Sequence, residues 1–179
     1  MLAWLKSSRD RRQVARSLYG SSVTAARARV MYAQWGVPDT LRGRFEMIAL
    51  HVALVLRRLG AEGWSGRRLG VAVTEAFVAD LDDGMRELTF GDLAVPREIK
   101  RAAAALFDRH TAYLAALAAP SAVLLDAALE AQLAYLVPGG GLDVRLLSDY
   151  VKRCASALDA QPAAQILAGR IAWPDPEGS

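Results

Sequence analysis

The chain has 179 residues, of which 53% are apolar and 23% are charged, so it can build one domain with a hydrophobic core and is not a disordered chain. Its single cysteine, Cys154, excludes an intramolecular disulfide and a metal site made of cysteines alone. The net charge is +3. The longest apolar stretch, from Met47 to Leu56, is broken by His51 and is shorter than the roughly 20 residues of a membrane-spanning helix. We also expect no secretory signal, because apolar residues precede the first charges.

Positive charge is concentrated in the first residues. Residues 1–16 hold five basic side chains against one acid and carry +4, which leaves −1 for the rest of the chain. We interpret residues 1–18 as a basic N-terminal arm or short helix that ends at a break near 20–22. The arm is either solvated or in weak contact, through residues 1–16, with a membrane surface or a ribosome, with Leu2, Trp4 and Leu5 as apolar anchors.

The string GVPDTLRGR, from Gly36 to Arg44, has the features of a turn that leads into a helix. Pro38 stiffens the approach, and Asp39 or Thr40 is expected to accept a hydrogen bond from a free backbone N–H of the first turn. We therefore predict that Pro38, Asp39, Thr40 and Arg44 have a structural role.

The helix predicted over 45–59 is apolar on two sides. At about 100° per residue, one stripe consists of Phe45, Ile48, Val52, Leu56 and Leu59. A second stripe lies nearly opposite. Such a helix is either central in its bundle or presents one side to a partner, and methionine adapts well to varied apolar surfaces. The candidate partner-binding residues on this helix are Met47, Leu50, His51 and Leu54.

A second long helix is predicted from about residue 67 to 88. Asp80, Asp83 and Glu87 border its apolar stripe, where an unpaired charge would be costly. We expect at least one of them to pair with an arginine of another segment, with Arg44 or Arg109 favoured. If the second stripe of the preceding helix is buried, the surface near three further candidates becomes the expected partner contact: Asp82, Arg86 and Asp92.

The rest of the chain continues the helical pattern. Apolar residues keep a spacing of three or four from Ile99 to Leu117, from Leu125 to Leu136 and from Leu147 to Leu158. Further breaks are predicted near 60–66, 90–96, 119–121, 138–141 and 160–162. The fold class is all-α, a single compact bundle of about six or seven helices. It comprises a helical domain over 19–172 and a disordered tail over 173–179.

No catalytic, cofactor or metal site is predicted. A helical di-iron site needs two Glu-x-x-His repeats, and neither His51 nor His110 has a glutamate three residues before it. The glycine patterns of phosphate-binding loops and dinucleotide sites, and the Gly-x-Ser-x-Gly of hydrolases, are absent. His51, on an apolar helix, is read as a hydrogen-bonded core histidine.

Two strings carry a family resemblance: GVPDTLRGRFEMIALH at 36–51 and DLDDGMRELTFGDLAVP at 80–96. With YGSSVTAARA at 19–28, the Arg57-Arg58-Leu59 helix end and Arg109 followed by Ala112-Tyr113, they resemble the ubiquinol–cytochrome c chaperone family. The resemblance extends from about Tyr19 to Leu117 and fades beyond Ala118.

The resemblance implies a non-enzymatic assembly chaperone. Such a protein would bind nascent or newly inserted cytochrome b and promote biogenesis of ubiquinol–cytochrome c reductase. Members of the family can work with a small helper protein, which makes a helper a candidate partner. The implied location is the cytoplasm, peripheral at the bacterial inner membrane, or the matrix side of the mitochondrial membrane in a eukaryote. No cofactor is implied.

The alternative is a helical carrier or enzyme for a small apolar ligand such as quinone or haem. Haem would need an axial ligand, for which only His51 and His110 are available as histidines. A closed apolar cavity with a histidine pointing into it would favour the carrier. Specific nucleic-acid binding fits poorly, because aromatic residues make up 7% of the chain and basic residues outside the arm are balanced by acids.

Overall fold

The computed structural model describes residues 2–87, 95–119 and 121–178, and all secondary structure within these ranges is helical, which confirms the predicted all-α class. Six helices have twelve residues or more, in agreement with the expected number for the described part of the chain. In chain order the elements are α1 (Leu2–Ala26), α2 (Arg29–Ala33), α3 (Leu41–Gly60), α4 (Gly63–Glu87), α5 (Val95–Ala118), α6 (Ala122–Leu133), the 3₁₀ turn η1 (Ala134–Leu136), α7 (Val144–Ala160) and α8 (Ala163–Leu167).

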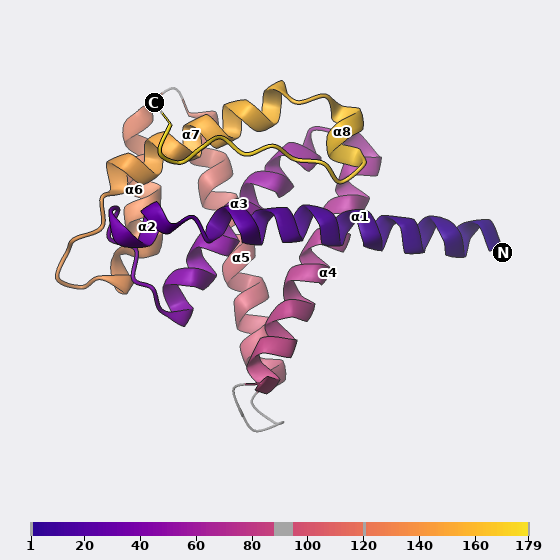
Figure 1. The fold of residues 1–179 in the computed structure, drawn as a ribbon, viewed down its shortest axis with the longest axis horizontal. Coiled ribbons are helices and arrows are strands. Elements are labelled where there is room, and N and C mark those ends of the chain that lie inside the picture. The colour runs from indigo at the N-terminus through magenta and orange to yellow at the C-terminus, as the bar shows by residue number, and fades with distance from the viewer. Residues whose placement is uncertain (1, 88–94, 120, 179) are drawn as a thin grey trace.

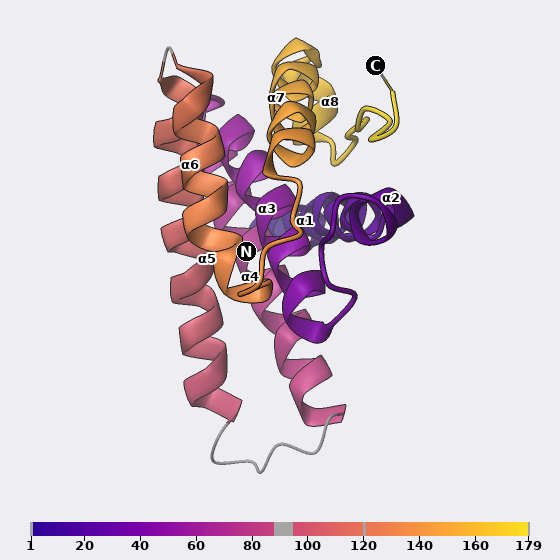
Figure 2. The same cartoon turned by 90° about the vertical axis from the view of Figure 1, so that its left-hand side faces the viewer.

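Helix α3 is the centre of the bundle. It packs against α1, α4, α5 and α7, and the views in Figures 1 and 2 show these helices surrounding it. Its first turn is held by Thr40, whose Oγ1 accepts a hydrogen bond of 3.2 Å from the Gly43 N–H. Thr40 is therefore the cap, and the structural role predicted for this turn is confirmed at that residue.

Helix α1 does not end where the sequence suggested. The break expected near 20–22 is wrong, because the helix continues to Ala26 and its N-terminal part projects from the bundle (Figure 1). The hydroxyl of Ser22 donates to the Leu18 carbonyl at 3.0 Å, inside the helix. Burial of Ala15, Leu18 and Ala26 against the core outweighs the propensity cost of Gly20, which is about 1 kcal/mol.

Helices α4 and α5 run antiparallel and extend together from the bundle, with α6 beside one half of α5 (Figure 2). Helix α5 begins at Val95 and carries Pro96 in its first turn, the position where proline is tolerated. Most of the break predicted at 90–96 lies outside the described residues. The breaks at 60–66 and 160–162 are confirmed by the ends of α3 and α7.

Two distant turns meet beside α7. The Asp143 N–H donates to the Trp35 carbonyl at 2.8 Å. Gly36 has φ +78°, and a Cβ placed there would lie 1.8 Å from the Gly141 carbonyl oxygen. Only glycine fits this approach without moving the backbone.

Arginines at the end of α3 hold the end of α7. The guanidinium of Arg58, 7% exposed, donates to the carbonyls of Leu158 and Gln161 at 2.8 and 3.1 Å. Arg57 donates to the Ala155 carbonyl at 3.1 Å and to the Asp159 carboxylate at 2.7 Å. The last carbonyls of a helix lack partners within it, and cations are favoured there, so these contacts satisfy the C-terminus of α7.

The C-terminal segment is not a disordered tail. Residues 173–178 lie against α1 and α7, and the indole N–H of Trp173 donates to the hydroxyl of Ser21 at 3.0 Å. Trp173 also packs against the hydrophobic core, which explains its order. The expectation drawn from the proline- and glycine-rich composition was therefore wrong.

Candidate functional site

The apolar stripe proposed to face a partner is buried. Met47 and Leu50 are inaccessible to solvent and Leu54 is 1% exposed, because α3 has helices on several sides. The central-helix interpretation is thus confirmed, and these three residues cannot form a surface contact in this fold.

His51 is also buried, among aromatic side chains. Its Nδ1 lies 2.7 Å from the Met47 carbonyl and its Nε2 lies 2.9 Å from the Tyr150 hydroxyl. A carbonyl can only accept, so Nδ1 carries the proton and Nε2 accepts from Tyr150. Burial lowers the pKa of His51 to about 4, although the bond to Met47 works in the opposite direction. His51 is therefore a neutral core residue and not a partner contact.

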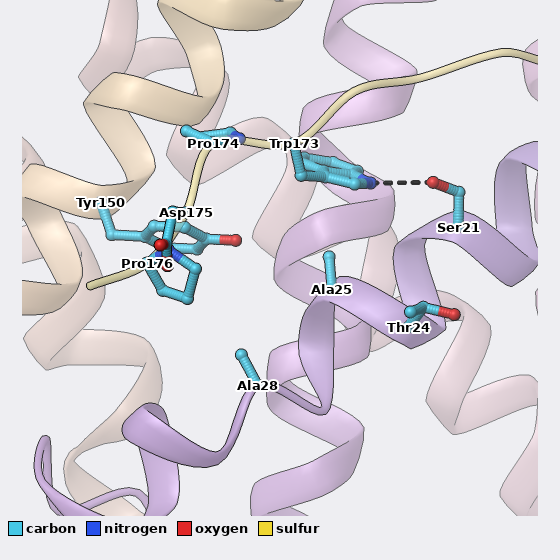
Figure 3. A pocket seen from close by; sticks show the side chains of 9 residues that line it. All are labelled: Ser21, Thr24, Ala25, Ala28, Tyr150, Trp173, Pro174, Asp175 and Pro176. Atoms are coloured by element: carbon cyan, nitrogen blue, oxygen red, sulfur yellow. Dashed lines mark hydrogen bonds between the residues drawn. The ribbon is translucent and has the colours of Figure 1, made fainter. Parts of the chain in front are cut away.

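An open hollow of about 400 Å³ lies beside this cluster. Figure 3 shows α1 on one side of it and the segment Trp173–Pro176 on the other, with Tyr150 at its edge. Its lining residues are Ser21, Thr24, Ala25, Ala28, Tyr150, Trp173, Pro174, Asp175 and Pro176. No histidine lines the hollow, so it lacks the feature that would favour a haem carrier.

The other candidate nucleophiles and bases are occupied or unreactive. Burial raises the pKa of the Cys154 thiol to about 12, so the reactive thiolate is disfavoured at neutral pH. His110 contacts the Ala53 carbonyl at 3.2 Å through Nδ1, and burial lowers its pKa. Among the described residues, no group of three or more histidines, cysteines or acids is arranged to hold a metal ion.

A buried ion pair joins α3 to α5. The carboxylate of Glu46, inaccessible to solvent, accepts two hydrogen bonds from the guanidinium of Arg109 and one from the hydroxyl of Tyr135. Burial disfavours the charged guanidinium, but Glu46 outweighs this and the pKa of Arg109 is raised. Burial and Glu46 together raise the pKa of Tyr135 to about 12. The sequence analysis missed Glu46, because it lies within an apolar helix.

Asp80 of α4 has another partner than expected. Asp80 accepts a hydrogen bond of 2.7 Å from the Tyr19 hydroxyl of α1. The arginines expected to pair with the α4 acids are engaged elsewhere, Arg44 with Asp39 at 2.6 Å and Arg109 with Glu46. The expected pairing with these arginines is therefore not found for Asp80 or Asp83, and the side chain of Glu87 lies outside the described residues. Asp83 is exposed.

The alternative contact surface, near Asp82, Arg86 and Asp92, lies partly outside the residues that the structure describes. Asp82 is half-buried on α4. Arg86 and Glu87 belong to the last turn of α4, but their side chains, together with Asp92, lie outside the described residues. This surface remains a candidate.

An apolar surface that the sequence analysis missed lies on α6. Leu125, Leu129 and Leu133 are at most 2% exposed and attach the helix to the core. Its opposite side is also apolar, with Val123 70% exposed and Leu124 50% exposed. A helix that is apolar all round is normally buried. The signal was present in the sequence, because no lysine or arginine occurs between Arg109 and Arg145.

The model of the ubiquinol–cytochrome C chaperone family matches residues 33–173. The chain belongs to the ubiquinol–cytochrome C chaperone family. The match continues well past residue 118, where the resemblance was expected to fade, and it includes α6, α7 and Trp173. Helix α7 packs against α3, and α6 packs against α5 and α7, so the C-terminal third shares the hydrophobic core of the rest of the chain.

A solved relative supports this assignment for the chaperone over its whole length. The crystal structure of the Cbp3 homolog from Brucella abortus is 33% identical in sequence, with a TM-score of 0.84. The similarity covers 99% of this chain and 98% of that chain. A search of curated proteins gave no match. Among the described residues of the chaperone, no helix is long and apolar enough to cross a bilayer.

Proposed function

We propose that this chaperone binds cytochrome b and thereby promotes biogenesis of ubiquinol–cytochrome c reductase, the third respiratory complex. The observation that carries the proposal is the match to the family model over residues 33–173. The full-length similarity to the Cbp3 homolog agrees with it, because nearly every element of the chain has a counterpart in that structure.

The proposed mode of action is binding and not catalysis. Both ring nitrogens of His51 are occupied by hydrogen bonds inside the core, and the only thiol is buried. A family of assembly factors needs a stable scaffold and a surface that recognises a client. The buried Glu46–Arg109 pair and the arginine contacts at the end of α7 supply the first requirement.

The proposed location is peripheral, at the cytoplasmic face of the bacterial inner membrane, where a newly inserted client is within reach. The basic part of α1 is the proposed membrane-surface or ribosome contact, since Arg9, Arg12 and Arg16 are exposed along it. A small helper protein remains a proposed additional partner.

Deletion and complementation test the proposal. Cells without the chaperone should lose assembled reductase, measured by native gel electrophoresis, while cytochrome b transcripts stay at their normal level. Re-expression of the chain should restore the complex. Normal reductase in the deletion strain would contradict the proposed function, whatever the fold.

A further inference from the structure

The segment from Thr111 to Val144 has an unusual distribution of charge. It contains three acids, Asp126, Glu130 and Asp143, and no lysine or arginine. The segment forms the second half of α5, α6, η1 and the turn before α7. The charged side chains of this segment are therefore acidic only, in a protein whose net charge is +3.

The exposed side of α6 is arranged as a strip. Val123, Ala127, Glu130 and Ala134 are all exposed and follow a spacing of three or four, which places them on one side of a helix. We name these four residues the α6 strip. From its first to its last residue the strip is about 16 Å long, at 1.5 Å per residue. Three turns of a second helix could lie along it.

The strip ends in a hollow at the foot of α6. Glu130 and Ala134 line this hollow together with Val137, Pro138, Leu142 and Val144. Its volume is about 240 Å³, below the roughly 300–1,000 Å³ of small-molecule pockets. The hollow suits a side chain of a partner better than a cofactor. With apolar walls and one carboxylate, it can hold the aliphatic stem of a lysine or arginine and place the cation beside Glu130.

The charge distribution decides between occupants of the strip. An anionic membrane surface would be repelled by Glu130, the one charged residue of the strip. A two-fold pairing with a second copy would leave Glu130 of both copies in the interface without a basic partner from either strip. An apolar helix with a basic residue at one end satisfies both the apolar strip and Glu130. Transmembrane helices have this character, because lysine and arginine flank them on the cytoplasmic side.

We propose that the α6 strip and its hollow bind an apolar helix of the client that carries a lysine or arginine at one end. The identity of the client as cytochrome b rests on the proposed function above. The binding mode is a helix laid along an apolar groove, with one charged anchor that fixes its direction.

Site-specific photo-crosslinking during synthesis of cytochrome b tests the location. The crosslinking amino acid replaces Val123 or Ala127 in the full chain, expressed in the deletion strain. Matched controls replace Val71 on α4, which is 61% exposed against 70% for Val123, and Asp83 near the end of α4. We expect crosslinked cytochrome b from the two α6 positions and little from the two controls.

Surface variants test the chemistry. Val123→Glu should reduce the cytochrome b captured with the chain by roughly tenfold, as expected for a charge placed within an apolar interface. Val71→Glu is the matched control and should leave capture unchanged. Glu130→Lys should reduce capture more than Glu130→Gln, since it repels a basic residue as well as losing its partner. Thermal melts of each variant show whether the fold is kept.

Each contrary result has a distinct meaning. Crosslinks to cytochrome b from Asp83 or Val71, but not from α6, would overturn the α6 strip and leave the proposed function intact. Crosslinks from Val123 to a second copy of the chain, or to lipid, would also overturn it. Equal capture of cytochrome b by Glu130→Lys and by the unaltered chain would contradict the proposed contact between Glu130 and a basic residue of the client. A chain that captures no cytochrome b at any position, in a strain with normal reductase, would contradict the proposed function itself.

Discussion

Trp173 and Ser21 are joined by a hydrogen bond of 3.0 Å, although 152 positions separate them in the chain. The indole ring also meets the imidazole of His51 edge to face, with ring centroids 5.1 Å apart. One side chain of the C-terminal segment therefore contacts both α1 and the central helix α3.

Trp173→Ala should destabilise the chaperone by about 2–4 kcal/mol, because a large aromatic side chain is lost from the edge of the core. Trp173→Phe keeps most of the packing and loses the hydrogen bond, so it should cost about 1 kcal/mol. Urea denaturation followed by circular dichroism measures both. Equal stability of Trp173→Ala and the unaltered chain would show that the segment is not part of the folded core.

Loss of the N-terminal cap of α3 should lower stability when Thr40 is replaced, but not when its neighbour Asp39 is replaced. Thr40→Ala removes the acceptor for the Gly43 N–H and should cost about 1 kcal/mol. Asp39→Ala serves as the control, because its ion pair with Arg44 is exposed and such pairs contribute little. The comparison uses melting temperatures, and the cap assignment fails if the two variants behave alike.

Loss of the buried Glu46–Arg109 pair should lower the free energy of unfolding far more than loss of the neighbouring Tyr135 hydroxyl. Arg109→Met leaves the Glu46 carboxylate without its cation and should destabilise the fold by about 3–5 kcal/mol. Tyr135→Phe removes one hydrogen bond and should cost about 1 kcal/mol. The double variant Glu46→Leu with Arg109→Met should recover part of the loss, since no isolated charge is left in the core. A double variant less stable than Arg109→Met would contradict this account.

Stability should fall on acidification because of His51. Its pKa is about 4 in the fold, against the usual 6.5 expected when the chain is unfolded. Between these values the unfolded chain binds more protons, so the free energy of unfolding decreases as the pH falls from about 6.5 to about 4. The contribution of this residue reaches about 3 kcal/mol. The free energy of unfolding, measured by denaturation at several pH values between 7 and 4.5, should depend less on pH for His51→Gln than for the unaltered chain. An identical pH dependence of the two would show that His51 is not responsible.

The sequence predicted what depends on local periodicity. The two apolar stripes of α3 predicted either a central helix or one that faces a partner, and the turn before it offered Asp39 or Thr40 as the cap; the structure selects the central position and Thr40. The Glu46–Arg109 pair could not be found in this way, because the two residues are 63 positions apart and Glu46 lies among apolar neighbours. The order of residues 173–178 depends on packing against α1, which overrides a composition typical of loops.

The α6 strip shows a different limit of sequence reasoning. The sequence pattern identified the apolar spacing from Leu125 to Leu136, but it did not identify the apolar residues on the opposite side of α6, such as Val123 and Leu124. Only the structure shows that its outer side is exposed. The absence of basic residues from Thr111 to Val144 was visible in the sequence and would have marked the region as distinct.

The bond between Trp173 and Ser21 also sets an order of events during synthesis. Helix α1 leaves the ribosome long before residue 173 is added to the chain. The hydrogen bond of Ser21 to Trp173 and the ring contact of His51 with Trp173 can therefore form only after the last described segment is synthesised. Until that segment leaves the exit tunnel, the imidazole lacks the indole ring of Trp173, and the hollow of Figure 3 lacks the wall formed by Trp173–Pro176. The native state is therefore completed after translation of this segment, and a chain stalled shortly before residue 173 should be more sensitive to protease along α1.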